Sequence, residues 1–159
     1  MQIQLSQKER MLLEDQRNQE ETCVKKYQNY ASQAQDPQLK QLFNKIATEE
    51  QHHYDIINQI LNGQQPNLSH PQPNQQPMPQ GGQTQQASPQ NTMNNQADKV
   101  LCSDLLSTEK YVSGTYDTVI FECVNPTIRQ ALQHIQQDEH QHGKELFDYM
   151  NSHGMYNVK

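Results

Sequence analysis

Residues 49–55 read EEQHHYD, and residues 138–144 read DEHQHGK. In both stretches a glutamate precedes a histidine by three residues, which is close to one turn of an α-helix. The glutamate and the histidine of such a pair therefore lie on the same helix face. A small acidic chain thus carries carboxylates and imidazoles one helical turn apart in two places, and this pattern points to the fold.

The two stretches belong to a longer internal repeat. When the sequence is shifted by 89 positions, residues 12–61 align with residues 101–150 without a gap, with nine identical pairs. A repeat that retains acidic, aromatic and histidine positions indicates a duplicated structural unit. The retained pairs include Glu20/Glu109, Tyr27/Tyr116, Pro37/Pro126, Glu50/Glu139 and His53/His142.

Each unit has the pattern of two helices joined by a short turn. Apolar residues recur at spacings of three and four, which predicts amphipathic helices. Asp36 and Asn125 interrupt this pattern at equivalent positions, and each is followed by proline, as is typical of a helix N-terminus. The sequence therefore predicts an all-α four-helix bundle built from two duplicated αα-hairpins. Residues expected to face inward include Leu13, Phe43, Val112 and Leu132.

The two hairpins are separated by a stretch of different composition. No Asp, Glu, Lys or Arg occurs between Asp55 and Asp98, and residues 63–97 are rich in Gln, Pro, Asn and Gly. Such a stretch cannot bury enough apolar surface to offset its conformational entropy, so we expect a disordered crossover linker. A coil of this length reaches about 30 Å, comparable to helices of roughly 35 Å. The first hairpin is expected at residues 1–62 and the second at residues 98–159, together forming one bundle domain.

Composition excludes several functional classes. The formal charge is −6 at pH 7 and no basic stripe is present, so nucleic acid is not an expected partner. No apolar run is long enough to span a membrane, and the stretch MQIQLSQKERMLLEDQ lacks a signal-peptide core, so we expect synthesis in the cytoplasm without a signal peptide. The three cysteines, Cys23, Cys102 and Cys123, are too few and too scattered for a disulfide framework, and we expect buried thiols.

The expected inward helix faces also contain charged residues. Four carboxylates facing one another in an apolar interior would cost several kcal/mol per uncompensated ion. Two divalent cations would compensate these charges, one held by the Glu-x-x-His pair of each hairpin. Oxygen and imidazole donors suit a dinuclear manganese or iron centre, with zinc as an alternative, and the sequence leaves a metal-free bundle open. The expected ligands are Glu20, Glu50, His53, Glu109, Glu139 and His142.

The repeat separates the two overlapping pairs of the first stretch. Glu49 and His52 correspond to Asp138 and Gln141, so this pair does not recur. We expect Glu49 and His52 to lie on the flank of the site, in solvent or behind the ligands. Four further histidines have no counterpart in the other unit and are not expected to be ligands: His70, His134, His140 and His153.

Two tyrosines are placed near the expected site. Tyr27 and Tyr116 lie two helical turns beyond Glu20 and Glu109 on the same helix faces. A buried tyrosine needs a hydrogen-bond partner for its hydroxyl group. We therefore expect both to be core aromatic residues with hydroxyl partners rather than redox groups.

Both hairpins resemble known families. The first, with Glu20, Tyr27 and LFNKIATEEQHH at residues 42–53, resembles rubrerythrin and other ferritin-like proteins. The end of the second, NPTIRQALQHIQQDEHQHGKELFDYMNSHGMYNVK, resembles the coat F domains of endospore-forming bacteria, most closely in its YMNSHGMY segment. The resemblance covers residues 10–159 apart from the linker. It implies a ferritin-like four-helix bundle located in or under the spore coat.

Two functional hypotheses follow. The first is a structural component of the spore coat, whose partners are other spore coat proteins or further copies of itself. The resemblance implies this role, because coat F proteins are regarded chiefly as structural. The alternative is a dimetal oxidoreductase acting on hydrogen peroxide or dioxygen, similar to rubrerythrin or manganese catalase, which the complete set of six ligands favours. The two roles are compatible, and no catalytic side chain is assigned.

Overall fold

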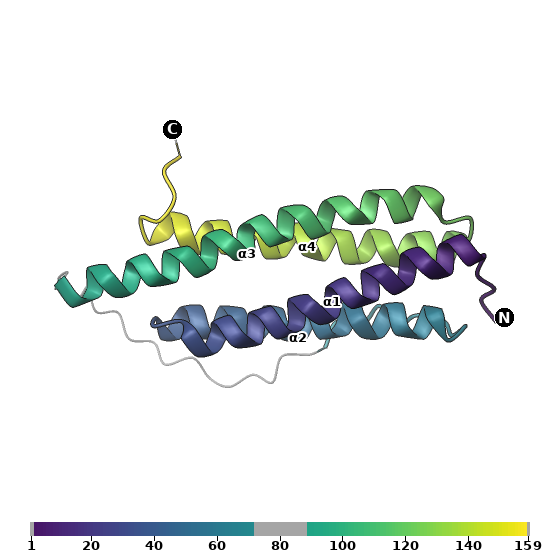
Figure 1. The fold of residues 1–159 in the computed structure, drawn as a ribbon, viewed down its shortest axis with the longest axis horizontal. Helices are drawn as coiled ribbons and strands as arrows, with labels where there is room; N and C mark the ends of the chain where they lie inside the picture. The colour runs from purple at the N-terminus through teal and green to yellow at the C-terminus, as the bar shows by residue number, and fades with distance from the viewer. Residues whose placement is uncertain (1, 72–88, 159) are drawn as a thin grey trace.

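The computed structural model describes residues 2–71 and 89–158. α1 packs along α2, and α3 packs along α4, so the chain forms two antiparallel hairpins (Figure 1). The predicted all-α architecture of two αα-hairpins is therefore confirmed. The helices are α1 (Gln7–Gln33), α2 (Pro37–Leu61), α3 (Pro89–Glu122) and α4 (Pro126–Ser152).

The two hairpins lie along each other in a four-helix bundle. Between the hairpins, α1 contacts α3 and α2 contacts α4. α2 ends at one end of the bundle and α3 begins at the opposite end (Figure 1). The end of α2 and the start of α3 therefore lie about a bundle length apart, as a crossover topology requires. The disordered linker was expected at residues 63–97, and residues 72–88 of this range lie outside the described residues.

Local sequence explains where α2 and α4 begin. The Asp36 side chain accepts a hydrogen bond of 2.9 Å from the backbone N–H of Gln38. Asn125 accepts one of 2.8 Å from the backbone N–H of Thr127. A proline follows each cap in the first turn, where its missing N–H costs no hydrogen bond. The predicted helix starts at these two positions are confirmed.

α3 begins earlier than the expected start of the second hairpin. The ends of α1 and α3 are equivalent in the repeat, because 33 plus 89 is 122. The start of α3 at Pro89, however, lies within the range 63–97 expected to be linker. The sequence contains neither Pro nor Gly from residue 90 to residue 113, so a helix nucleated by the packed part of α3 can extend towards its N-terminus.

The interior of the bundle has two apolar clusters, one towards each end. The residues predicted to face inward from the helical spacing are buried, among them Leu13, Phe43, Val112 and Leu132. All three cysteines are buried and free, and no helix in the described part combines the length and apolar character needed to cross a membrane. One cluster includes Leu13, Ile57, Val119 and Ile128, and the other includes Ala31, Phe43, Leu105 and Leu146.

Candidate metal centre

A polar layer separates the two apolar clusters in the middle of the bundle. Each helix contributes one glutamate to this layer, and α2 and α4 each add a histidine from the following turn. None of these six side chains belongs to a residue more than 3% exposed. The structure thus brings together the residues that the sequence singled out: Glu20, Glu50, His53, Glu109, Glu139 and His142.

The six residues form two overlapping groups of possible ligands. In each group, one ligand atom per residue can be chosen so that all lie within 4.8 Å of one another. Glu50 and Glu139 belong to both groups, so they are placed to bridge two ions. The sequence paired each of these glutamates with the histidine three residues later, and the overlap adds that each also lies near the ligands of the other group. The first group is Glu20, Glu50, His53 and Glu139, and the second is Glu50, Glu109, Glu139 and His142.

The two imidazole rings each turn the same nitrogen towards the carboxylates. His53 Nδ1 lies 3.2 Å from Glu50 Oε2 and 3.0 Å from Glu139 Oε1. His142 Nδ1 lies 3.3 Å from Glu50 Oε1 and 3.8 Å from Glu109 Oε1. Two atoms bound to one ion at about 2.0–2.2 Å are themselves roughly 3 Å apart. The spacing is therefore compatible with shared metal ions.

The outer nitrogen of each ring is held by a carboxylate from the other hairpin. His53 Nε2 lies 3.1 Å from Asp138 Oδ2, and His142 Nε2 lies 2.7 Å from Glu49 Oε2. In a neutral ring, such a contact favours the proton on the outer nitrogen, which would leave Nδ1 free to bind a metal. Glu49 and Asp138 occupy equivalent positions in the repeat, because 49 plus 89 is 138. The structure places Glu49 behind a candidate ligand, one of the two positions that the sequence left open for it, and the retained negative charge was the sequence signal for the matching role of Asp138.

The two tyrosines hold candidate ligands across the hairpin boundary. Tyr27 Oη donates a hydrogen bond to Glu109, and Tyr116 Oη donates one to Glu20. Burial, reinforced by neighbouring carboxylates, raises the pKa of both tyrosines, so the hydroxyl groups keep their protons and act as donors. The expected hydroxyl partners are thus the glutamates of the opposite hairpin.

The layer retains protons when no cation is bound. Burial, with the charges of Glu139 and Glu50, raises the pKa of Glu109 well above its ordinary value. Burial alone would lower the pKa of His142, but contacts with Glu49 and Glu50 outweigh it and raise this pKa to about 10. Contacts with four carboxylates likewise outweigh burial and raise the pKa of His53. Protons therefore provide part of the charge compensation that cations would otherwise supply.

The donor atoms fit a pair of divalent cations. Several buried carboxylate oxygens of the layer have no hydrogen-bond partner within the described residues. Leaving a buried acceptor unpaired costs about 1–3 kcal/mol, and more for a charged group. A bound cation would satisfy such oxygens directly. They are Glu20 Oε2, Glu50 Oε1, Glu109 Oε2 and both carboxylate oxygens of Glu139.

The C-terminal tail packs back onto the bundle. Tyr149 Oη donates a hydrogen bond of 2.6 Å to Asp36 Oδ2, which ties the end of α4 to the cap of α2. His153 stacks on Tyr149 with ring centroids 4.0 Å apart. Gly154 then takes a φ of +67°, a conformation that favours glycine, and the buried Met155 follows. The YMNSHGMY segment thus packs against this end of the bundle and covers it.

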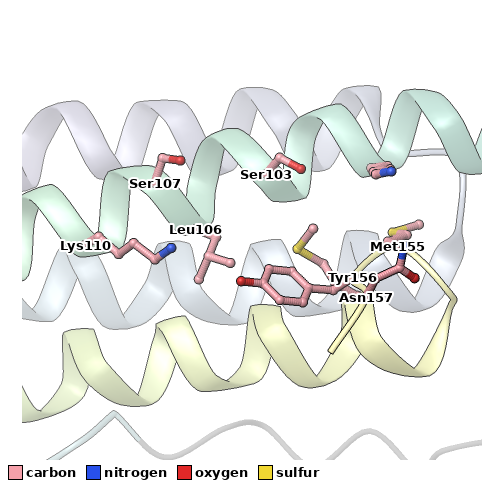
Figure 2. Close-up of a pocket in the computed structure, with 9 residues that line it drawn as sticks. Ser103, Leu106, Ser107, Lys110, Met155, Tyr156 and Asn157 are labelled. Atoms are coloured by element: carbon pink, nitrogen blue, oxygen red, sulfur yellow. The ribbon is translucent and has the colours of Figure 1, made fainter. Parts of the chain in front are cut away.

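A shallow surface pocket of about 400 Å³ lies between α3 and this tail (Figure 2). Tyr156 lies in it between the tail and α3, and its ring also packs edge-on against Phe147 at 5.0 Å. The other lining residues include Ser103, Leu106, Ser107 and Lys110. This combination contains no group of metal ligands, so the pocket is not a second candidate for the centre.

Comparison with known proteins concerns the second half of the chain. Residues 97–159 match the family model of the Coat F domain, which covers most of α3, all of α4 and the tail. Searches of curated proteins and of solved structures found no match. The resemblance of the second hairpin to coat F domains is confirmed. Residues 97–159 of this chain are therefore similar to the Coat F domain family.

Proposed function

We propose that this protein is a structural component of the bacterial spore coat whose ferritin-like bundle holds a dinuclear metal centre. The Coat F domain at residues 97–159 supports the coat location. The metal centre rests on one observation, the buried layer of four glutamates and two histidines with unpaired carboxylate oxygens. Exposed side chains of Tyr111, Phe121 and Val124 offer surface for contacts with other coat proteins or further copies.

The donor set favours manganese or iron. Glu50 and Glu139 would bridge the ions, Glu20 and His53 would complete one coordination set, and Glu109 and His142 would complete the other. Carboxylate oxygens and imidazole nitrogens suit these metals better than thiolate-seeking ones. Burial raises the pKa of the nearby Cys23 thiol, which therefore stays protonated and is a poor ligand.

Such a centre would strengthen the bundle. Each ligand group takes residues from three helices and from both hairpins. A cation that binds the folded bundle but not the unfolded chain stabilises it in proportion to the logarithm of its concentration. Metal ions that link the two hairpins would make the folded bundle more stable, which suits a structural protein of the spore coat.

An oxidoreductase acting on peroxide or dioxygen is the second candidate. It is favoured by a surface cavity of about 230 Å³ whose lining includes Glu49, Asp138 and His142, at the outer side of the centre. A small oxidant could approach along this side, whereas a purely structural centre needs no access. A manganese or iron pair would supply two-electron redox chemistry there. Oxygen release from hydrogen peroxide by manganese-loaded protein, absent after chelation, would favour this candidate.

Elemental analysis of the protein purified from spores tests the metal centre. We expect two equivalents of manganese or iron, lost in the double variant Glu50→Gln/Glu139→Gln. Glu21→Gln is the matched control, because Glu21 adjoins Glu20 but is exposed. A folded, metal-free native protein would contradict the metal centre.

Spore fractionation tests the location separately. We expect the protein in the coat extract, with its amount unchanged by the double variant. Recovery only from the spore interior would contradict the coat assignment and leave the metal question untouched.

A further inference from the structure

A second group of metal-binding side chains lies at the surface, outside the buried layer. His70 comes from the segment after α2, whereas His134 and Asp138 lie four residues apart on α4. His70 Nε2 lies 3.7 Å from Asp138 Oδ1, and His134 Nε2 lies 3.6 Å from Asp138 Oδ2. The rings of His70 and His134 have centroids 5.0 Å apart. Neither histidine was expected to be a ligand from the sequence, because neither has a counterpart in the repeat.

These contacts are too long to be hydrogen bonds but suit ligands of one ion. His134 Nε2 is shielded from solvent and has no hydrogen-bond partner in the described part of the chain. Two donors held at about 2.0–2.1 Å by a tetrahedral ion lie about 3.3 Å apart. The observed separations therefore need to shrink only slightly around a cation.

The chain places His70 beside α4 through several contacts. The backbone N–H of Gln64 donates to Gln59 O at 2.9 Å, and that of Asn67 donates to Gln59 Oε1 at 2.7 Å. Leu68 packs against the apolar cluster at this end of the bundle. The segment is thus folded back onto the helices, while the His70 side chain remains 53% exposed. An ion at this position would keep coordination sites open to solvent.

We propose that His70, His134 and Asp138 form a second metal site, which binds Zn²⁺. Two imidazoles and one carboxylate favour zinc over manganese and iron, because nitrogen-rich sites follow the general affinity order of the divalent metals. The buried layer, with four carboxylates to two imidazoles, has the more oxygen-rich donor set. The two sites thus differ in donor set and in solvent access.

Asp138 connects this site to the buried layer. Its Oδ2 also lies 3.1 Å from Nε2 of His53, so the same carboxylate faces His134 on one side and His53 on the other. The surface site does not depend on the proposed buried centre, because none of its three ligands is among the six proposed ligands of that centre. An ion bound to Asp138 would compete with His53 for the carboxylate charge.

Zinc titration of the full chain tests the surface site. We expect His70→Ala and His134→Ala each to bind one zinc equivalent fewer, or to bind it at least about tenfold more weakly, than the wild type. His140→Ala is the control, because His140 is an exposed histidine of α4 outside both groups. His70 lies in a surface segment, and circular dichroism would verify that each variant is folded.

Electron paramagnetic resonance with Cu²⁺ gives a second measurement. We expect nitrogen couplings from two imidazoles in the wild type and from one in His70→Ala. The variant Glu50→Gln/Glu139→Gln should keep the surface zinc, which separates this site from the buried centre. Unchanged zinc stoichiometry and affinity in both His70→Ala and His134→Ala would overturn the proposal.

Discussion

Glu49 shows how much a single carboxylate can contribute without being a ligand. It accepts from the outer nitrogen of His142 at 2.7 Å, and Asp138 does the same for His53. The sequence distinguishes Glu50 from Glu49 through the repeat, since only the former pairs with a recurring histidine. It does not show which histidine Glu49 contacts, because that contact crosses from one hairpin to the other.

We expect Glu49→Ala to weaken Mn²⁺ binding by roughly tenfold to a hundredfold, as is typical when the carboxylate behind a metal-binding histidine is removed. His52→Ala, one helical turn further on, should leave the affinity nearly unchanged. Calorimetric titration of both variants measures the difference. Equal affinities for Glu49→Ala and the wild type would show that His142 is not oriented for metal by this contact.

The tyrosine contacts give a second prediction for single residues. Tyr116→Phe removes the donor to the fully buried Glu20 and leaves the carboxylate without this partner. We expect the metal-free protein to lose about 1–3 kcal/mol of unfolding free energy. Tyr111→Phe is the control, because Tyr111 is 69% exposed. Urea unfolding with a chelator present compares the two, and equal losses would argue against a special role of the buried hydroxyl.

At the level of helices, the sequence predicts local features better than contacts between hairpins. The caps at Asp36 and Asn125 depend on neighbouring residues and follow from the sequence alone. The inward positions follow from helical periodicity, including all six residues of the polar layer. The first residue of α3 could not be predicted in this way. The composition of the linker shows that it lacks core-forming residues, but it does not show how far a packed helix extends into it. The contacts of His70 with α4 depend on how the chain folds back after α2.

Glu9 provides a test of helix capping. It accepts from the backbone N–H of Ser6 at 2.8 Å and from that of Val124, in the turn between α3 and α4, at 2.9 Å. Burial alone would raise the pKa of Glu9, but these hydrogen bonds outweigh it and lower the pKa below its ordinary value of 4.5. The charged carboxylate of Glu9 therefore contributes fully to the free energy of unfolding above pH 4.5. This contribution is lost as the pH falls through the lowered pKa of the folded state.

We accordingly expect Glu9→Gln to cost about 1 kcal/mol at neutral pH. The difference from the wild type should shrink below pH 4.5, as protonation removes the carboxylate charge. Asp15→Asn, an exposed change on the same helix, is the control. Chemical unfolding at several pH values would show the trend, and a cost independent of pH would contradict the proposed role of the charge.

For the whole molecule, the polar layer makes stability depend on protons and cations together. The folded pKa of His142 is about 10, against an ordinary value of 6.5. Between these values the folded state binds a proton that the unfolded state has released. The contribution of His142 to the free energy of unfolding is thus fully present below pH 6.5, and it is lost as the pH rises to about 10. The raised pKa of Glu109 acts in the same direction from its ordinary value of 4.5 upwards.

The melting temperature of the metal-free protein should therefore fall as the pH rises from about 5 to about 9, whereas Mn²⁺ should oppose this fall. A cation displaces the protons of the layer, so its affinity increases with pH while proton compensation is lost. Melting curves with chelator and with Mn²⁺, each across this pH range, test the coupling. Glu50→Gln/Glu139→Gln should remove the effect of Mn²⁺, whereas His70→Ala should retain it. A flat metal-free profile without any Mn²⁺-dependent shift would mean that the six side chains only pack the bundle.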